Sequence, residues 1–352
     1  MAELLVTGGA GFIGANFVHY WRKHHPADGI TVLDALTYAG NRENLASVQS
    51  VDLVEGDICD TALVTTLLDE RDIDTIVHFA AESHVDRSIS GPDAFVQTNV
   101  VGTHSLLKAA KAVWLDNNKP HRFHHVSTDE VYGSLGEDDP AFSESTPYAP
   151  NSPYSASKAG SDHLVRAYHH TFGLQTTTSN CSNNYGPYQF PEKLIPLFLL
   201  NCLHGRALPI YGDGMNRRDW LHVDDHCHGI ELAILKGQPG HVYNIGGGQE
   251  LPNMAVIDEI CRTVDNAFVA DRSLVDRFPD APAAQGQPSA TLKTFVTDRK
   301  GHDRRYAIDA TKISTELGYA PRRDFSEGLA ETLAWYLGNE HWWRALVERL
   351  RA

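Results

Sequence analysis

Tyr154 and Lys158 lie four residues apart in the segment Tyr-Ser-Ala-Ser-Lys. Residues at this spacing share one face of a helix, and a lysine ammonium beside a phenol favours the phenolate and lowers its pKa. Such a tyrosine can take a proton from a hydroxyl group while a hydride leaves the same carbon. The same pair also arises by chance on exposed helices, so its meaning depends on whether a hydride acceptor binds nearby.

Two adjacent carboxylic acids, Asp129 and Glu130, end a predicted strand in the segment Val-Ser-Thr-Asp-Glu-Val-Tyr-Gly at 126–133. In open α/β sheets, ligands bind at the carboxyl ends of the strands. The two acids could divide general-acid and general-base work if their surroundings separate their pKa values. A solvated turn with no chemistry explains the spacing equally well, and both interpretations stay open at this point.

A glycine-rich turn supplies a candidate acceptor site. The run Thr-Gly-Gly-Ala-Gly-Phe-Ile-Gly at 7–14 follows a predicted strand and opens a predicted helix. Glycines permit the tight turn and let the backbone approach a pyrophosphate, which also meets the positive end of the helix dipole. Asp34 ends the second strand, where a carboxylate binds a ribose diol and repels a 2′-phosphate. The pattern predicts NAD rather than NADP. A glycine turn in an unrelated α/β protein is the alternative, and Asp34 weighs against it.

The elements that must position these residues alternate between strand and helix. We predict strands at residues 3–7, 30–34, 52–55, 75–79, 122–127 and 175–179, and helices at 12–23, 60–70, 92–114 and 152–171. This alternation predicts right-handed crossovers and a Rossmann-type, doubly wound parallel sheet with helices on both faces.

After residue 180 the rhythm changes, and we predict a smaller C-terminal α/β part. The expected division is a nucleotide-binding domain at 1–180 and a mainly substrate-binding domain at 181–352, although later strands can rejoin the first sheet. The segment 280–291 is rich in Ala, Pro, Gln and Gly, which predicts an exposed loop. The segment 324–350 is predicted to be helical.

Composition and charge exclude several classes of protein. The chain has 352 residues, of which 42% are hydrophobic and 21% charged, as in a globular domain rather than a disordered chain. Its net charge of −15 repels nucleic acid phosphates, so we expect no nucleic acid partner. There is no apolar run of about 18 residues, and no basic segment precedes an apolar one at the N-terminus, so we expect neither a membrane partner nor a secretory signal.

Cysteine and histidine patterns point the same way. The five cysteines are odd in number and form no Cys-x-x-Cys motif, which indicates reduced thiols in a cytoplasmic protein. The run His222–His228 resembles a metal cluster, but neighbouring side chains point in different directions and no second ligand group accompanies it. We expect a helix start there, with Asp224 or Asp225 as its N-cap, and no metal.

The glycine turn, the Tyr154/Lys158 pair and the chain length together resemble the extended short-chain dehydrogenase/reductase family. Three more selective strings are similar to the nucleotide-sugar 4,6-dehydratases within it. They are Ala-Ala-Glu-Ser-His-Val-Asp-Arg-Ser at 80–88, Ser-Thr-Asp-Glu-Val-Tyr-Gly at 127–133 and Asn-Cys-Ser-Asn-Asn-Tyr-Gly-Pro-Tyr-Gln-Phe-Pro-Glu-Lys-Leu at 180–194. The resemblance extends from the first strand to about residue 309, with no departure at a catalytic position.

This resemblance implies a three-step reaction on dTDP-glucose with a tightly bound NAD that is regenerated in each cycle. Tyr154, aided by Lys158 and Thr128, would deprotonate the 4-hydroxyl as hydride leaves C4. Glu130 would remove the C5 proton and Asp129 would protonate the departing C6 hydroxyl. Return of the hydride to C6 and of a proton to C5 would give dTDP-4-dehydro-6-deoxyglucose.

The resemblance also assigns binding positions. Expected cofactor contacts are Gly8, Gly11, Phe12, Ile13, Gly14, Asp34, Ala35, Leu36, Thr37, Asp57, Ile58, Phe79, Ala80, Ala81, Ser83, Thr98, Tyr154, Lys158 and Asn184. Expected substrate contacts are Ser83, Thr128, Asn183, Lys193, Leu194, Pro209, Ile210, Tyr211, Arg218, Asn253, Asp298, Arg299 and His302. In the last stretch, Lys300 departs from the family pattern, which has a neutral residue there, often proline.

Three alternatives remain. A nucleotide-sugar 4-epimerase would need the Tyr154/Lys158 pair but not the two adjacent acids, and a related 4,6-dehydratase would act on another nucleotide sugar. A regulator that binds the cofactor without catalysis would not need intact acids. By family analogy we also expect a homodimer that pairs the helices at 92–114 and 152–171.

Overall fold

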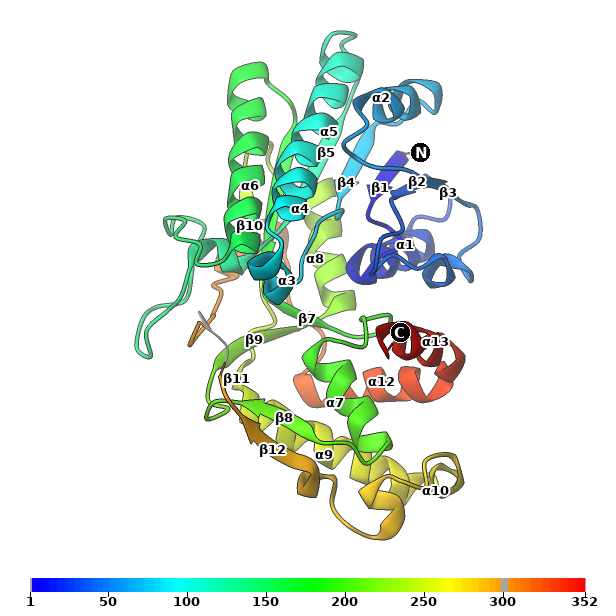
Figure 1. The fold of residues 1–352 in the computed structure, drawn as a ribbon. Coiled ribbons are helices and arrows are strands. Elements are labelled where there is room, and N and C mark those ends of the chain that lie inside the picture. The colour runs from blue at the N-terminus through cyan, green and yellow to red at the C-terminus, as the bar shows by residue number, and fades with distance from the viewer. Residues whose placement is uncertain (1, 299–302, 352) are drawn as a thin grey trace.

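Seven parallel strands form the centre of the computed structural model, which describes residues 2–298 and 303–351 (Figure 1). The strand order is β10-β6-β5-β4-β1-β2-β3. From β3 to β6 this is the order of doubly wound dinucleotide-binding sheets, and the winding reverses between β1 and β4, where a ligand crevice is expected. The predicted fold class is confirmed. The strands are β1 (Glu3–Thr7), β2 (Gly29–Asp34), β3 (Val51–Glu55), β4 (Thr75–His78), β5 (Arg122–Thr128), β6 (Thr176–Cys181) and β10 (Val242–Ile245).

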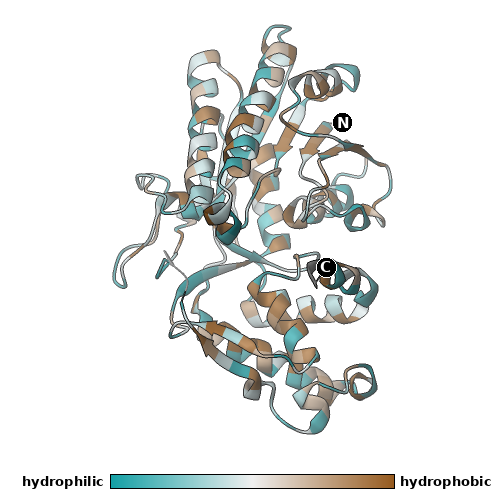
Figure 2. Ribbon diagram, in the orientation of Figure 1, coloured by the Kyte–Doolittle hydropathy of each residue, from teal (hydrophilic) through white to brown (hydrophobic). Residues whose placement is uncertain are grey.

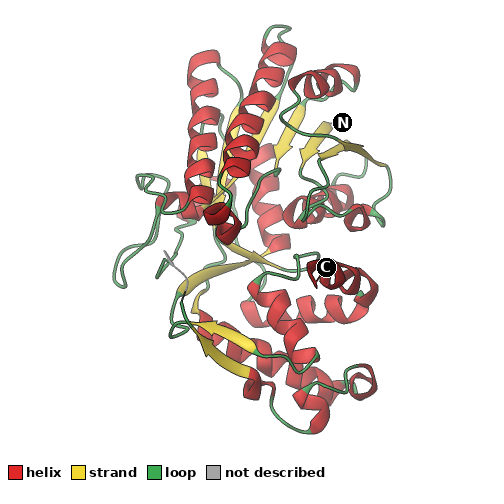
Figure 3. Ribbon diagram, in the orientation of Figure 1, coloured by secondary structure: helices red, strands yellow, loops and turns green. Residues whose placement is uncertain are grey.

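Helices cover both faces of this sheet, as Figure 3 shows for the face toward the viewer. On one face, Trp114 and Phe123 are fully buried in a cluster that joins the sheet to α2, α5 and α6. On the other face, Trp21 and Ile230 belong to a cluster with α1, α8 and α11. These helices are α1 (Phe12–His24), α2 (Thr61–Glu70), α5 (Thr103–Ala110), α6 (Pro153–Phe172), α8 (Val223–Leu235) and α11 (Thr311–Leu317).

The predicted helix at 92–114 is interrupted. It consists of α4 (Asp93–Phe95), a π-helical stretch (Val96–Gly102), α5 and a second π-helical stretch (Lys111–Leu115). Within the first stretch, buried Asn99 accepts a hydrogen bond from the Glu82 backbone N–H at 2.9 Å and donates to the Glu82 carbonyl and the Ser157 hydroxyl. The π-helical stretch therefore ties the loop after β4 to α6, and such stretches are frequent at functional sites.

The second half of the chain contributes to the first sheet and also builds a smaller part. Strand β10 pairs with β6, and α8 packs on α1, so residues beyond 180 belong to the nucleotide-binding layer. The division of the chain into domains at residue 180 stays a prediction. The smaller part contains β7 (Asn183–Tyr185), β8 (Leu208–Tyr211), β9 (Arg217–His222), β11 (Glu250–Pro252), β12 (Lys293–Val296), α7 (Leu194–Leu203), α9 (Asn253–Ala270), α10 (Ser273–Arg277), α12 (Phe325–Gly338) and α13 (Glu340–Arg351).

This smaller part has its own hydrophobic core. Figure 2 shows hydrophobic residues along α7, which packs on α9. The core also contains the fully buried side chains of Phe278, Tyr336 and Trp343. Trp342 connects the two parts, because its indole N–H donates to Asn44 Oδ1 at 2.7 Å.

The segment 324–350 is helical as predicted and forms two helices, since α12 ends at Gly338 and α13 begins at Glu340. Two other local predictions were wrong. Residues 280–291 are not a simply exposed loop, because Ala281 and Ser289 are fully buried and the segment forms two 3-10 turns. Helix α8 is capped by the His222 side chain, which accepts from the Asp224 backbone N–H, rather than by Asp224 or Asp225. Among the described residues, no helix is long and apolar enough to cross a bilayer.

Candidate active site

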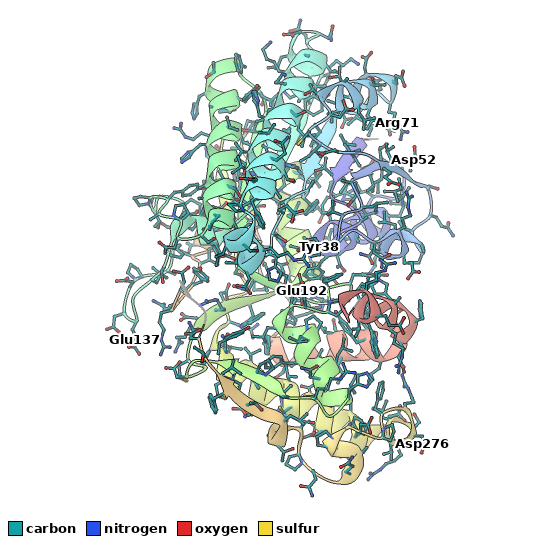
Figure 4. All side chains as sticks on the ribbon, viewed as in Figure 1. Tyr38, Asp52, Arg71, Glu137, Glu192 and Asp276 are labelled. Atoms are coloured by element: carbon teal, nitrogen blue, oxygen red, sulfur yellow. The ribbon has the colours of Figure 1, made fainter. Side chains whose placement is uncertain are left out.

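A cavity of about 390 Å³ opens at the carboxyl ends of the parallel strands. Its wall comes from the β1–α1 turn, from the ends of β2, β4, β5 and β6, and from the segment that follows β6. Parallel strands end at one edge of a sheet, so residues distant in sequence meet there. In Figure 4 the labelled side chains of Tyr38 and Glu192, which line the cavity, lie where the two parts of the molecule meet.

Gly8 and Gly14 in the glycine turn carry no side chains, and their backbone packs so closely against neighbouring backbone that no side chain would fit there. This absence of side chains leaves room for a ligand. Gly8 has a φ of +70°, and a Cβ there would lie 2.6 Å from the Ala80 nitrogen. A Cβ on Gly14 would lie 2.3 Å from the Gly8 carbonyl oxygen. Both glycines line the cavity at the start of α1. The turn therefore presents backbone, and not side chains, to whatever occupies this end of the cavity.

Asp34 is held in place at the end of β2. Its Oδ2 accepts from the Ala10 backbone N–H at 2.9 Å, and its Oδ1 accepts from the Leu36 N–H at 2.8 Å. Burial raises the pKa of the Asp34 carboxyl, and these two hydrogen bonds oppose that rise. Asp34 lines the cavity, so its position suits a ribose diol.

Asp129 and Glu130 stand at the end of β5, where the chain enters a 3-10 turn (Asp129–Tyr132). Both line the cavity, and Asp129 is almost fully buried. Burial raises the pKa of Asp129 well above its ordinary value, and the neighbouring Glu130 and Asp219 raise it further. Thr128 donates to Asp129 Oδ1 at 3.4 Å, while no described group binds Asp129 Oδ2. Burial and the neighbouring acids therefore favour the protonated form of Asp129.

Tyr154 and Lys158 lie in the first two turns of α6, which begins at the Ser152 capping box with Pro153 in its first turn. Both side chains line the cavity together with Thr128. The predicted lowering of the Tyr154 pKa by Lys158 is wrong for this structure. Burial raises the pKa of Tyr154 well above its usual value, Glu130 raises it further, and a hydrogen bond with Thr128 opposes the rise. The Lys158 ammonium donates instead to the Val126 carbonyl at 2.8 Å.

The structure brings most of the expected cofactor positions together. Of the expected cofactor residues, only Leu36 does not line the cavity, and its backbone N–H holds Asp34. The cavity wall also contains four of the expected substrate positions: Ser83, Thr128, Asn183 and Lys193.

The other expected substrate positions lie in the smaller part, away from the cavity wall. Leu194 begins α7, residues 209–211 are in β8, Asn253 begins α9, and Asp298 follows β12 beside Gly212. Arg299 and His302 lie outside the described residues.

Arg218 is buried on β9 rather than presented at the surface. Its guanidinium donates to the Asp303 carbonyl at 2.8 Å and to the Arg217 carbonyl at 2.7 Å, and it lies 4.3 Å from the centre of the Tyr306 ring. Its charge lowers the pKa of Asp129, against the larger effect of burial. Arg218 therefore lies within electrostatic reach of the paired acids.

Several residues that line the cavity did not emerge from the sequence analysis. They include Tyr38, Gly40, Glu82, Gln189, Phe190 and Glu192. Arg87 lies 3.7 Å above the Tyr38 ring and its Nη2 is 3.7 Å from Glu192 Oε2. His84 Nε2 is 3.5 Å from Glu192 Oε1. Glu82 and Glu192 fall inside two of the selective strings, and this position within a family motif was the available signal of a functional role. Nothing in the local sequence indicates that the two strings meet.

The His222–His228 run is engaged in ordinary contacts. His226 Nδ1 is 2.9 Å from Asn184 Oδ1, Asp224 pairs with Arg323, and Asp225 accepts from the backbone N–H groups of 322 and 323. Among the residues the structure describes, no group of three or more metal-binding side chains is found.

The doubly wound sheet, the glycine turn and the Tyr154/Lys158 helix define an extended short-chain dehydrogenase/reductase, the class that the sequence resembled. The sequence model of the GDP-mannose 4,6 dehydratase family matches residues 5–332. The chain is 54% identical to dTDP-glucose 4,6-dehydratase of Xanthomonas campestris pv. campestris (strain B100), over 99% of this chain and 97% of that protein. The chain thus belongs to the dTDP-glucose 4,6-dehydratase family.

Two solved structures support this assignment. The DesIV dTDP-glucose 4,6-dehydratase of Streptomyces venezuelae, solved with NAD bound, has a TM-score of 0.84 and 50% identity over 98% of this chain and 99% of that chain. UDP-glucose 4-epimerase of Thermotoga maritima, solved with UDP-glucose, has a TM-score of 0.82 but only 26% identity, over 96% of this chain and 99% of that chain. The fold is thus shared with epimerases, while the sequence is much closer to the dehydratases.

The close packing at Gly8 makes a testable prediction. Gly8→Ala is expected to abolish NAD binding, because the new methyl group would collide with the backbone at Ala80. Gly286→Ala is the matched control, since Gly286 has a similar φ of +73° and nothing within 4 Å of its Cβ. Gly286→Ala should lose about 1 kcal/mol or more of unfolding free energy through the positive φ alone, and Gly8→Ala should lose more, because the backbone collision adds to the same effect. NAD bound per chain is the measurement, and equal retention by the two variants would contradict the proposed cradle.

Proposed function

We propose that this chain catalyses the NAD-dependent dehydration of dTDP-glucose to dTDP-4-dehydro-6-deoxyglucose. The observation that carries the proposal is one cavity lined by the buried Asp129, its neighbour Glu130 and the Tyr154/Lys158 pair. A simple alcohol dehydrogenase or an epimerase needs the pair only. The acids become necessary when a proton and a hydroxyl group must leave adjacent carbons.

The residues present fit NAD. The glycine turn offers backbone N–H groups for a pyrophosphate, and Asp34 faces the position expected for the adenosine ribose. Lys158 and Tyr154 line the same cavity from α6. When bound, NAD accepts a hydride from C4 of the sugar and later returns it to C6. The remaining expected cofactor residues of the cavity wall would hold it there.

Tyr154 is the proposed base for the sugar 4-hydroxyl. Its phenol is buried and its pKa is raised in this structure, so the phenol loses its proton only when other groups of the site stabilise the phenolate. Thr128 supplies a hydrogen bond that favours the phenolate, and the Lys158 ammonium supplies a positive charge on the same helical face. The raised pKa implies that the phenolate forms during the reaction and is not the resting state.

Asp129 and Glu130 are the proposed acid and base of the elimination. Because its pKa is raised, Asp129 keeps a proton that it can give to the departing C6 hydroxyl. Glu130 is less buried and lines the same cavity, and it is assigned removal of the C5 proton. Thr128 accepts a hydrogen bond from the Glu130 backbone N–H at 3.2 Å, which fixes the turn that carries both acids.

The nucleotide of the substrate is assigned to the smaller part. Lys193 lines the cavity and Arg218 lies near the acids, so both cations can approach a diphosphate. Residues 209–211 on β8 are assigned to the thymine base, together with the remaining expected substrate positions. The structure of Arg299 and His302 is outside the described residues, and their role rests on the family resemblance.

We also propose a cytoplasmic homodimer that pairs the helical segment 92–114 and α6 of two chains. Val96 and Val101, on the π-helical stretch before α5, are 53% and 41% exposed, and Phe172 at the end of α6 is 46% exposed. Such apolar positions favour burial against a partner. All five cysteines are free thiols, in keeping with a reducing compartment.

The substrate assay separates the candidate functions. The purified chain is expected to convert dTDP-glucose to a product lighter by one water, which mass spectrometry detects. A hexose of unchanged mass with inverted C4 would indicate an epimerase, and preferential turnover of a UDP-, CDP- or GDP-sugar would move the substrate to another nucleotide.

Two variants test the order of steps. Tyr154→Phe should abolish C4 oxidation, so no bound NADH forms when dTDP-glucose is added, because the hydroxyl proton has no acceptor. Glu130→Gln should still form bound NADH but release no dehydrated product. Absorbance of the nicotinamide and product mass are measured on the same samples. Full dehydration by Glu130→Gln would remove Glu130 from its role.

The raised pKa of Asp129 predicts a pH dependence. A general acid works only while protonated, so water loss should be fully present below the raised pKa of Asp129 and fall as pH rises through it. Asp129→Asn cannot donate this proton and should lose about 10²-fold or more in water loss. Exchange of the C5 hydrogen in D₂O, assigned to Glu130, should persist. Retention of normal water loss by Asp129→Asn would contradict the assignment.

A further inference from the structure

Asp162 is a buried carboxylate behind the candidate active site, outside the residues assigned above. It follows Lys158 by four positions on α6, as Lys158 follows Tyr154, so the three side chains lie along neighbouring faces of one helix. Asp162 is only 5% exposed. A charge is rarely buried to this extent without a partner of opposite charge or a set of hydrogen-bond donors.

Three donors converge on the Asp162 carboxylate. Its Oδ2 accepts from the Ser127 hydroxyl and from the Tyr148 hydroxyl, both at 2.9 Å. Its Oδ1 is 3.0 Å from His125 Nε2, which also lies 3.2 Å from the Ser161 hydroxyl. Two of these donors, Ser127 and His125, are on β5, one to three residues before Thr128. Through these hydrogen bonds the carboxylate fixes the end of β5, which carries the paired acids.

The histidine in this set does not neutralise the carboxylate. His125 is fully buried, and both burial and the charge of Lys158 lower its pKa, so its imidazole is neutral and donates through Nε2. The buried cation nearest in sequence is Lys158, four residues before Asp162 on the same helix. The Lys158 ammonium is itself buried and bonded to the Val126 carbonyl.

We propose that Asp162 is a positioning residue for this reaction: its buried carboxylate keeps Lys158 charged and holds the end of β5 in register with α6. This inference rests on the proposed function, because it concerns the lysine that assists Tyr154. Burial alone lowers the pKa of Lys158, and Asp162 is the first group that raises it again. The other titratable groups near Lys158 are Cys181 on β6, His125 on β5, His78 on β4 and Tyr154 on α6.

Asp162→Asn tests the role of the negative charge, because asparagine keeps the shape of the Asp162 side chain and part of its hydrogen bonding. Without the carboxylate, Lys158 should lose its proton at lower pH. We therefore expect the alkaline limb of C4 oxidation, measured as bound NADH formed when dTDP-glucose is added, to move down by about one pH unit or more, whereas the pH dependence assigned to Asp129 belongs to water loss. The KM for dTDP-glucose should change less than about twofold, since Asp162 does not line the cavity. An unmoved alkaline limb in Asp162→Asn would overturn the proposal.

Tyr148→Phe is the matched control. It removes one of the hydrogen bonds to the same carboxylate oxygen and leaves the charge in place. A merely structural role for Asp162 predicts that both variants lose activity equally at every pH. The proposal predicts that only Asp162→Asn shifts the pH profile, and that Asp162→Glu restores the wild-type alkaline limb. Equal shifts in Asp162→Glu and Asp162→Asn would overturn it, even if Asp162→Asn is poorly folded.

The wild-type holoenzyme is the reference in every series, with bound NAD and thermal unfolding measured for each variant. Absence of dTDP-glucose turnover by the wild type contradicts the proposed function itself. A normal wild-type profile with an unshifted Asp162→Asn profile contradicts only the role of Asp162. The two failures are thus distinguishable.

Discussion

Burial of ionisable side chains at the carboxyl edge of the seven-stranded sheet is the constraint on which the candidate active site depends. Asp129, Tyr154 and Lys158 are 2%, 9% and 4% exposed. Removal from water disfavours the charged form of each group, so the pKa values of the acid and the phenol rise and that of the lysine falls. Burial therefore favours the proton-bearing form of Asp129, the proposed acid, and it opposes formation of the Tyr154 phenolate, which the proposed base has to reach.

The fold makes this burial possible because it satisfies the polar groups from several directions. Strand β5 brings Thr128 and the paired acids to the edge, and α6 lies against the same strand with Tyr154 and Lys158. The π-helical stretch before α5 positions Asn99, which binds the loop after β4 and Ser157 of α6. The segment after β6, with Asn183 and Lys193, closes the cavity from the side of the smaller part.

The relatives place these features in context. A 4-epimerase at 26% identity has the same architecture, whereas dTDP-glucose 4,6-dehydratases reach 50–54% identity over nearly the whole chain. The scaffold therefore does not by itself decide between inversion at C4 and loss of water. We propose that this choice lies in the environment of Asp129 and Glu130, where burial and the charge of Glu130 raise the pKa of Asp129.

Local patterns in the sequence determined the glycine turn, Asp34 at the end of β2, the order of strands and helices through β6, and the adjacency of the two acids, because each depends on residues close together in the chain. Local pattern predicted the helix at 92–114 but not its π-helical stretches, and it misjudged the cap of α8 and the partly buried segment 280–291, whose states are set by packing partners. Only the tertiary structure decided that Lys158 binds the Val126 carbonyl, that Glu192 meets His84 and Arg87, and that β10 joins the first sheet. The reason is physical: desolvation and ion pairing act through space, between segments that the sequence separates by tens of residues.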